Sequence, residues 1–356
     1  MSSVAEIQKT SQEAFYRETI SSNLNSFAID LLITTATPLT HWVKHSIGRE
    51  STEIFVPGRD KTEDVQIEID QKAEKFISIV ADRLSEKYGF SLSILSEHNN
   101  YEVGNKENPR HTLVLDPIEN SDEYRRKLPT PPYSQFQLYN TNNKPIRAGA
   151  VNLATGEMYL ALEGTNYYYH PELKKLIPMP KPREVTSIKD GHVAIASYDA
   201  KSKYAKPFEM LFEKFKEDAE LLGGSRHGKG GSHSYVDLAT GAIALYPMFI
   251  EPRGETDAAH LFALNAGCKV VEADLQTGEY QDYKFDPNKQ YERTPLLIAG
   301  RSKELIKESI SYYMQAKIKW ETADFELLKG IYYDYLSRMP AVADVLLQIF
   351  PKLKAA

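Results

Sequence analysis

Apolar residues recur at helical spacing in the first quarter of the chain. Residues 5–45 carry this period, most strongly at residues 27–33, and the pattern predicts two packed helices. Residues 72–87 predict another helix, with Asp70 near its start, where the helix dipole favours a negative charge. The apolar positions on one face of this helix are Ala73, Phe76, Ile77, Val80 and Leu84.

Further along the chain, the pattern changes to the alternation and short apolar runs that are typical of strands. Residues 146–164 predict two strands around a turn at residues 154–156, and residues 235–239 predict a further strand. A proline-rich segment at residues 171–182 indicates a boundary between subdomains. We therefore expect a mixed α/β fold. Its three parts are an N-terminal α/β subdomain (1–180), a C-terminal α/β subdomain (181–300) and a helical extension (301–356).

The extension contains two stripes of apolar residues at helical spacing. Ile306, Ile310 and Tyr313 belong to the first stripe, and Leu328 and Ile331 to the second. Stripes of this kind usually pack inside a fold. We expect these helices to cover the second subdomain or to form a homodimer interface, rather than to bind a substrate.

The composition agrees with a soluble enzyme and excludes several other classes of protein. The chain has 356 residues, of which 42% are hydrophobic, so it can bury a large core. Its formal net charge of −6 argues against nucleic-acid binding, which requires a positively charged face. We find no leader-like segment and no run of about 18 apolar residues that would suit a membrane. The single cysteine, Cys268, fits a buried apolar position. We expect a cytoplasmic protein with a small-molecule partner.

Candidate chemistry lies where the apolar run at residues 111–115 ends. Asp116 and Glu119 follow this run, and their carboxylates and the Ile118 carbonyl offer oxygen ligands to a hard divalent cation. The backbone N–H groups of Asn120 and Ser121 lie next in the chain and suit a phosphate. The alternative is a plain turn at the end of a strand, because Asp-Pro is common in turns.

Four segments occur in an order that resembles one superfamily. They are residues 70–75, 94–98, 116–121 and 255–260. The superfamily is that of the lithium-sensitive, magnesium-dependent phosphatases, which includes inositol monophosphatases, fructose-1,6-bisphosphatases and 3'(2'),5'-bisphosphate nucleotidases. Its motifs are a Glu-Glu pair, then D-P-[IL]-D-G-[ST], then W-D-x-A-A-G, and the resemblance covers roughly residues 50 to 300.

The resemblance implies a layered αβαβα sandwich and metal-assisted hydrolysis of a small phosphate monoester, such as an inositol, sugar or nucleotide phosphate. It implies two to three Mg²⁺ or Mn²⁺ ions in a site between the subdomains. The implied metal ligands are Glu97, Asp116, the Ile118 carbonyl, Glu119 and Asp257. Asp70 and Ser121 would share the proton of the attacking water, and Asn120 and Ser121 would cradle the phosphate.

The chain departs from the superfamily motifs at several positions. Glu119 replaces an Asp and extends that carboxylate by about 1.5 Å, and a misplacement of this size can lower a rate by about 10²-fold. Asn120 replaces a Gly, Thr256 a Trp, and His98 the second Glu. These changes leave open an alternative function, that of a non-catalytic superfamily member that binds a phosphorylated ligand or a protein partner.

A glycine-rich segment, residues 223–234, carries Arg226, His227, Lys229 and His233. These side chains suit the anionic or leaving portion of a substrate, and a solvent-exposed turn is the alternative. The spacing matches neither a nucleotide-binding P-loop nor a zinc motif.

Overall fold

The protein is described from a computed structural model of the whole chain. The described residues are 4–46, 53–55, 65–96, 99–104, 110–119, 131–193, 196–197, 231–250, 253–338 and 340–355.

The helices and strands fall into a strand-rich first half and a second half with more helices. In the first half they are α1 (Val4–Ser46), β1 (Glu53–Phe55), β2 (Val65–Ile67), α2 (Glu68–Tyr88), β3 (Ser91–Ser96), β4 (Asn100–Gly104), β5 (Arg110–Glu119), β6 (Tyr133–Tyr139), β7 (Pro145–Asn152), β8 (Met158–Leu162), β9 (Thr165–His170) and β10 (Lys175–Pro178). In the second half they are the short helix η1 (Ile188–Asp190), β11 (Ala196–Ser197), α5 (His233–Thr240), β12 (Leu245–Phe249), α6 (Arg253–Asp257), α7 (Leu261–Asn265), β13 (Lys269–Ala273), β14 (Tyr280–Asp282), β15 (Leu296–Gly300), α8 (Lys303–Thr322), α9 (Phe325–Arg338), α10 (Pro340–Ile349) and η2 (Pro351–Ala355).

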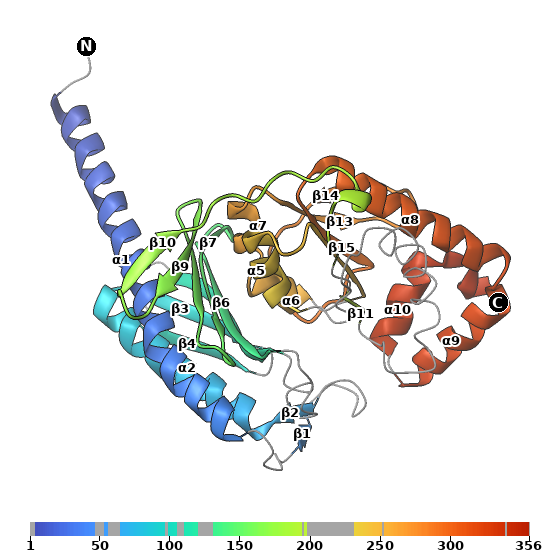
Figure 1. The fold of residues 1–356 in the computed structure, drawn as a ribbon, viewed down its shortest axis with the longest axis horizontal. Coiled ribbons are helices and arrows are strands. Elements are labelled where there is room, and N and C mark those ends of the chain that lie inside the picture. Colours follow the sequence, from blue (N-terminus) through green and yellow to red (C-terminus); the bar gives the residue numbers. More distant parts are fainter. Residues whose placement is uncertain are drawn as a thin grey trace.

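Two large sheets alternate with three layers of helices (Figure 1). Helices α1 and α2 pack on one face of an eight-stranded sheet with the order β10-β9-β8-β7-β6-β5-β3-β4. Helices α5 and α7 lie between this sheet and a five-stranded sheet with the order β11-β12-β15-β13-β14. The C-terminal helices cover the outer face of the second sheet. The predicted αβαβα sandwich is therefore confirmed.

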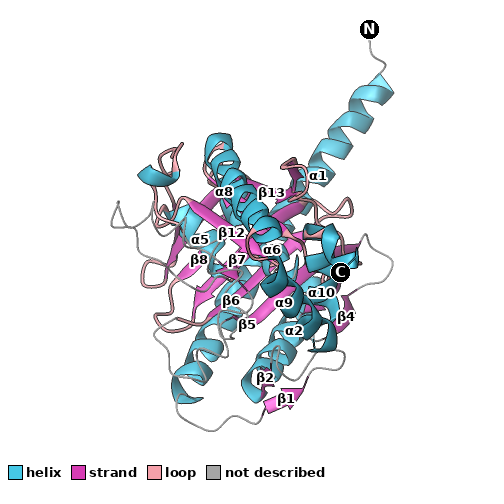
Figure 2. Cartoon of the chain, turned by 90° about the vertical axis from the view of Figure 1, so that its right-hand side faces the viewer, coloured by secondary structure: helices cyan, strands magenta, loops and turns pink. Residues whose placement is uncertain are grey.

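The N-terminal helical segment forms one helix where the sequence pattern predicted two. Helix α1 has 43 residues and continues through Pro38. Its buried positions keep one helical stripe from Leu24 through Leu31 to Val43, so the same face stays against the sheet along this length. The first turns of α1 project beyond the rest of the molecule (Figure 2). The prediction of two helices was wrong because this stripe is continuous.

The predicted helix after Asp70 and the predicted hairpin are both present. Helix α2 begins at Glu68, so Asp70 lies in its first turn. Strands β7 and β8 pair in antiparallel fashion around the predicted turn, and Gly156 there has a φ of 84°. A positive φ favours glycine because it has no Cβ.

Residues 235–239, predicted as a strand, lie in helix α5. The helix ends at Gly241, which has a φ of 91° and whose backbone N–H donates to the Asp237 carbonyl. This left-handed glycine is a common helix end. Almost every side chain of α5 is buried between the two sheets, so the helix has no polar face from which a helical period could be detected.

The extension after residue 300 is helical, as predicted. Ser302 caps α8, because its hydroxyl accepts a hydrogen bond from the Leu305 backbone N–H. Ile306, Ile310 and Tyr313 are buried against the second sheet. No helix in the described part of the chain has both the length and the apolar character that a membrane span requires.

Candidate metal centre

A β-bulge at the end of β5 turns two carboxylates toward the same side of the sheet. Asp116 lies opposite Gln135 of β6, whereas Glu119 lies opposite Tyr133. Three steps along β5 thus match two steps along β6. Side chains three residues apart in a regular strand point to opposite faces, and the extra residue of a bulge removes this difference. The bulge contains Pro117, which has no N–H to donate to the neighbouring strand.

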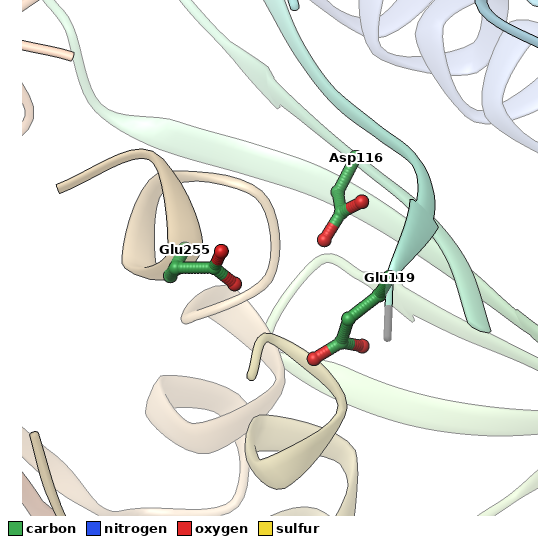
Figure 3. A group of neighbouring side chains, drawn as sticks. All are labelled: Asp116, Glu119 and Glu255. Atoms are coloured by element: carbon green, nitrogen blue, oxygen red, sulfur yellow. The ribbon is translucent and has the colours of Figure 1, made fainter. Parts of the chain in front are cut away.

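These two carboxylates meet a third one from the second half of the chain. One carboxylate oxygen each from Asp116, Glu119 and Glu255 lies within 4.8 Å of the other two. Glu255 is in the short helix α6, and Figure 3 shows the three carboxylates directed toward a common region. The group therefore joins the end of β5, in the first sheet, to α6 in the second half of the chain.

Glu119 is buried and accepts hydrogen bonds from the first turn of α5. The His233 backbone N–H lies 3.1 Å from Oε1 and 2.9 Å from Oε2. His233 Nδ1 lies 2.9 Å from Oε1, and Gln135 Nε2 donates to Oε2 at 2.6 Å. Gly231 lies so close that a Cβ at this position would overlap Oε1. The Glu119 carboxylate thus takes the place of an N-cap at the positive end of α5.

Asp116 is held by the residue that precedes α5. The hydroxyl of Ser232 donates to Asp116 Oδ2 at 3.0 Å. Ser232 is the N-cap residue of α5, but its side chain makes no capping hydrogen bond. Two neighbouring residues at this helix end, Ser232 and His233, therefore hold the two carboxylates of β5.

Asp257 lies two residues after Glu255 and is not part of the three-carboxylate group. Its side chain is fully buried, and Tyr283 Oη donates to Oδ1 at 2.6 Å. The guanidinium of Arg253 lies 4.6 Å from the centre of the Tyr283 ring. Oδ2 of Asp257 has no hydrogen-bond partner among the described residues. Burial raises the pKa of Asp257 to about 7.

Asp70 and Ile118 lie inside the first half of the molecule. Asp70 is buried in the first turn of α2, and its neighbour Ile69 belongs to the same apolar cluster as Ile118. The start of α2 and the end of β5 therefore contribute to one core. The structure leaves the roles of Asp70 and of the Ile118 carbonyl as predictions.

Six predicted site residues lie outside the described part of the chain: Glu97, Asn120, Ser121, Arg226, His227 and Lys229.

The ends of β3 and β4 on either side of residues 97–98 are held by the buried carboxylate of Glu74. This carboxylate accepts hydrogen bonds from Ser96 Oγ, Asn99 Nδ2 and Tyr101 Oη at 2.8, 2.8 and 2.7 Å.

Sequence reasoning did not select Glu255 or Ser232, and it counted His233 among the basic residues of an anion-binding loop rather than as a partner of Glu119. A signal for Glu255 was present, because Ala258 and Ala259 match the Ala-Ala of W-D-x-A-A-G. Counted back from these alanines, the Asp of the motif falls on Thr256, between Glu255 and Asp257. The sequence could not choose between these two acids. No comparable signal pointed to the contact between the helix end and β5, which is a tertiary feature.

The three-carboxylate group fits a hard divalent cation. Mg²⁺ and Mn²⁺ prefer oxygen ligands, and carboxylates are their usual protein partners. Three acidic side chains so close together repel one another, and a cation relieves this repulsion. Asp116, Glu119 and Glu255 would hold such an ion.

No family model and no curated protein matches this sequence. Solved structures do match. The extragenic suppressor protein SuhB from Bartonella henselae is 14% identical, with a TM-score of 0.59 over 80% of this chain and 96% of that one. The inositol monophosphatase of Thermotoga maritima is 16% identical, with a TM-score of 0.58 over 83% and 98%.

A third match comes from Staphylococcus aureus. Its inositol monophosphatase II is 13% identical, with a TM-score of 0.57 over 82% of this chain and 93% of that one. At these identities the comparison establishes the architecture. The matched proteins are covered almost from end to end, in agreement with the fold that the sequence motifs implied. The chain therefore has the fold of the inositol monophosphatases.

Proposed function

We propose that the chain is a metal-dependent phosphatase that hydrolyses a small phosphate monoester. The observation that carries this proposal is the group formed by Asp116, Glu119 and Glu255, at the end of a bulged strand in an inositol monophosphatase fold. A fold alone does not define an activity. A carboxylate group able to hold Mg²⁺ or Mn²⁺ supplies the chemical part of the argument.

The proposed metal ligands differ in one residue from those expected from the motifs. We assign Glu255, rather than Asp257, to the centre with Asp116 and Glu119. Glu97 and the Ile118 carbonyl complete a centre of two to three ions. A metal ion held by these residues would lower the pKa of a water molecule and neutralise charge on the phosphate. Among the described residues, the buried Asp257 side chain has one hydrogen-bond donor, Tyr283, which suits a supporting role at the end of α6.

The remaining steps belong to the chain's own groups. Asp70 and Ser121 hold and pass on the proton of the attacking water, and the N–H groups of Asn120 and Ser121 orient the phosphate. Arg226, His227 and Lys229 bind the leaving portion of the substrate through charge-assisted hydrogen bonds.

The ligands of similar proteins support a proposal for the substrate class. Among the matched Staphylococcus aureus structures, one contains inositol monophosphate and another contains 2'AMP. Both ligands are phosphate monoesters on a hydroxylated ring. We propose a substrate of this type, and a cytoplasmic location and a homodimer stay predictions.

A second candidate is a non-catalytic protein that binds a phosphorylated ligand or a protein partner. The observation in its favour is that His233 and Ser232 already donate to Glu119 and Asp116. These hydrogen bonds compete with a metal ion for the carboxylate oxygens.

Phosphate release distinguishes the two candidates. The wild type and Asp116→Asn are assayed against inositol, sugar and nucleoside monophosphates with Mg²⁺, with Mn²⁺ and with a chelator. We expect release by the wild type that requires the metal, and its loss in the variant. Absence of release from every ester, together with binding of a phosphate ester by calorimetry, would instead support the non-catalytic candidate.

A further inference from the structure

The surroundings of Glu119 are built to accept a glutamate. A shorter side chain at this position would end before it reaches the first turn of α5, whereas the Glu119 carboxylate lies against Gly231 and His233. Gly231 leaves space for Oε1, because any larger residue would place its Cβ on that atom. The longer acid and the glycine opposite it are therefore matched to each other.

Among the described residues, three donor groups give hydrogen bonds to Glu119, which limits what else its carboxylate can bind. The His233 backbone N–H is shared by both oxygens, His233 Nδ1 faces Oε1, and Gln135 Nε2 donates to Oε2. With the ring proton on Nδ1, the imidazole acts as a donor. A carboxylate has about four acceptor positions. These three donors make four contacts because the backbone N–H is shared, so a cation would take a position that this shared N–H fills only in part.

His233 is itself held in place from two sides. Its backbone begins helix α5, and its ring stacks on Tyr133 with the centroids 5.6 Å apart and the planes at 21°. Tyr133 is also the β6 residue that lies opposite Glu119 in the sheet. Tyr133 thus contacts the imidazole of His233 and pairs across the sheet with Glu119, whose carboxylate the imidazole holds.

We propose that His233 is a positioning residue for the metal centre. It orients the Glu119 carboxylate so that one oxygen faces the cation shared with Asp116 and Glu255. This inference rests on the proposed function, because the ion is the metal of that site. It goes further by assigning a role to a histidine that does not itself bind the metal. A donor behind a metal ligand fixes the direction of the ligand's lone pairs.

Binding of Mn²⁺, measured by calorimetry without any substrate, tests the proposal. The variants are His233→Ala, His233→Asn and, as a control at an exposed histidine, His192→Ala. Loss of a donor of this kind typically weakens metal binding by about 10-fold to 100-fold, and we expect this range for His233→Ala. The Asn side chain places an N–H near the position of Nδ1, so His233→Asn should recover most of the affinity. His192→Ala should match the wild type.

Two results would overturn the proposal. One is that His233→Ala binds Mn²⁺ as tightly as the wild type. The other is that His233→Asn binds it as weakly as His233→Ala, which would show that the Nδ1 donor is not what matters. Circular dichroism of each variant identifies those that do not fold, and Gly231→Ala then provides a second route to the same contact.

Gly231→Ala is made in the wild type and in Glu119→Asp, and melting is measured in a chelator. In the wild type the added methyl group displaces the carboxylate and should lower the melting temperature by several degrees. In Glu119→Asp the shorter side chain has withdrawn, so the same change should be much milder. Equal losses in both backgrounds would overturn the matched arrangement of Glu119, Gly231 and His233.

This metal-free comparison separates the two proposals. If the wild type binds no Mn²⁺, the proposed function fails, and the positioning role toward a cation fails with it. A larger drop in melting temperature on Gly231→Ala in the wild type than in Glu119→Asp would still establish the matched arrangement of Glu119, Gly231 and His233. If the wild type binds Mn²⁺ and His233→Ala binds it equally well, the positioning role fails and the proposed function stands.

Discussion

Glu119 and Asp257 are two buried carboxylates that the protein surrounds in opposite ways. Glu119 lies at the end of a strand, and three donor groups converge on it. Asp257 lies at the end of α6, where one donor among the described residues, the Tyr283 hydroxyl, contacts one oxygen, and burial raises the pKa of Asp257 to about 7. Donors compensate for the water that a buried carboxylate loses, and without them burial favours the protonated form. The surroundings of Glu119 therefore suit a metal ligand better than those of Asp257.

The largest expected effect contrasts the two acids of the 255–257 segment. Glu255→Gln should lower kcat/KM for the best phosphate ester by about 10²-fold or more, because it removes a proposed metal ligand. It should also abolish the rise in melting temperature that Mg²⁺ produces. Asp257→Asn keeps an acceptor for Tyr283 and should retain both properties. The reverse pattern would place the metal ligand at Asp257 and break the comparison.

The second prediction concerns folding stability without metal. Glu119→Ala leaves the donors of His233 and Gln135 without their acceptor and should lower the free energy of unfolding by about 3 kcal/mol. Asp257→Asn, the matched control, should change it by less than about 1 kcal/mol. Urea denaturation in a chelator measures both. Equal losses in the two variants would show that the number of donors does not distinguish these sites.

The third prediction extends the contrast to the buried histidine near Asp257. Burial lowers the pKa of His260 from 6.5 to about 4. Between these values the unfolded chain binds a proton that the folded chain does not, so this histidine destabilises the fold as the pH falls. The destabilisation caused by His260→Asn should therefore shrink from pH 6.5 to pH 4, by up to about 1.4 kcal/mol per pH unit.

Denaturation in a chelator at several pH values measures the free energy of unfolding of the variant and of the wild type. The pH dependence of the difference between them gives the predicted slope, because the contributions of the other titrating groups cancel. His192→Asn, at an exposed histidine, is the control for any slope that does not come from burial. A difference that stays constant across this range would contradict the prediction.

The smallest expected effect is at the other carboxylate of β5. Ser232→Ala removes the hydroxyl that donates to Asp116 and should lower the free energy of unfolding by about 1 kcal/mol. Asp116 is partly exposed, so water replaces much of what is lost. Thermal melting compares this variant with Ser134→Ala, a buried serine on β6. A loss as large as that of Glu119→Ala would mean that Ser232 holds the end of α5 by itself.

The layers of the fold and the residues of β5 could be predicted from the sequence, because they depend on local patterns and on motifs. The α2 stripe and the hairpin turn at Gly156 are examples. Helix α5 could not be predicted, since a short helix buried on almost every side shows no period. Glu255 was missed for another reason. Without its Trp, the motif no longer fixed the alignment of this segment. The choice between Glu255 and Asp257, which are two residues apart, required the three-dimensional structure.

Because of the bulge in β5, the site also depends on which face of the strand each carboxylate occupies. Asp116 and Glu119 face the same way only because the strand has one residue more than its partner between them. Changing either acid alters length or charge at a fixed location, whereas regular pairing of the same residues, without the bulge, would turn Glu119 to the face of the sheet that α1 and α2 cover. Evolution can therefore vary the acids of this centre one at a time, as the Asp-to-Glu difference illustrates. The irregular pairing between them is the feature that must be kept as long as three residues separate the two acids.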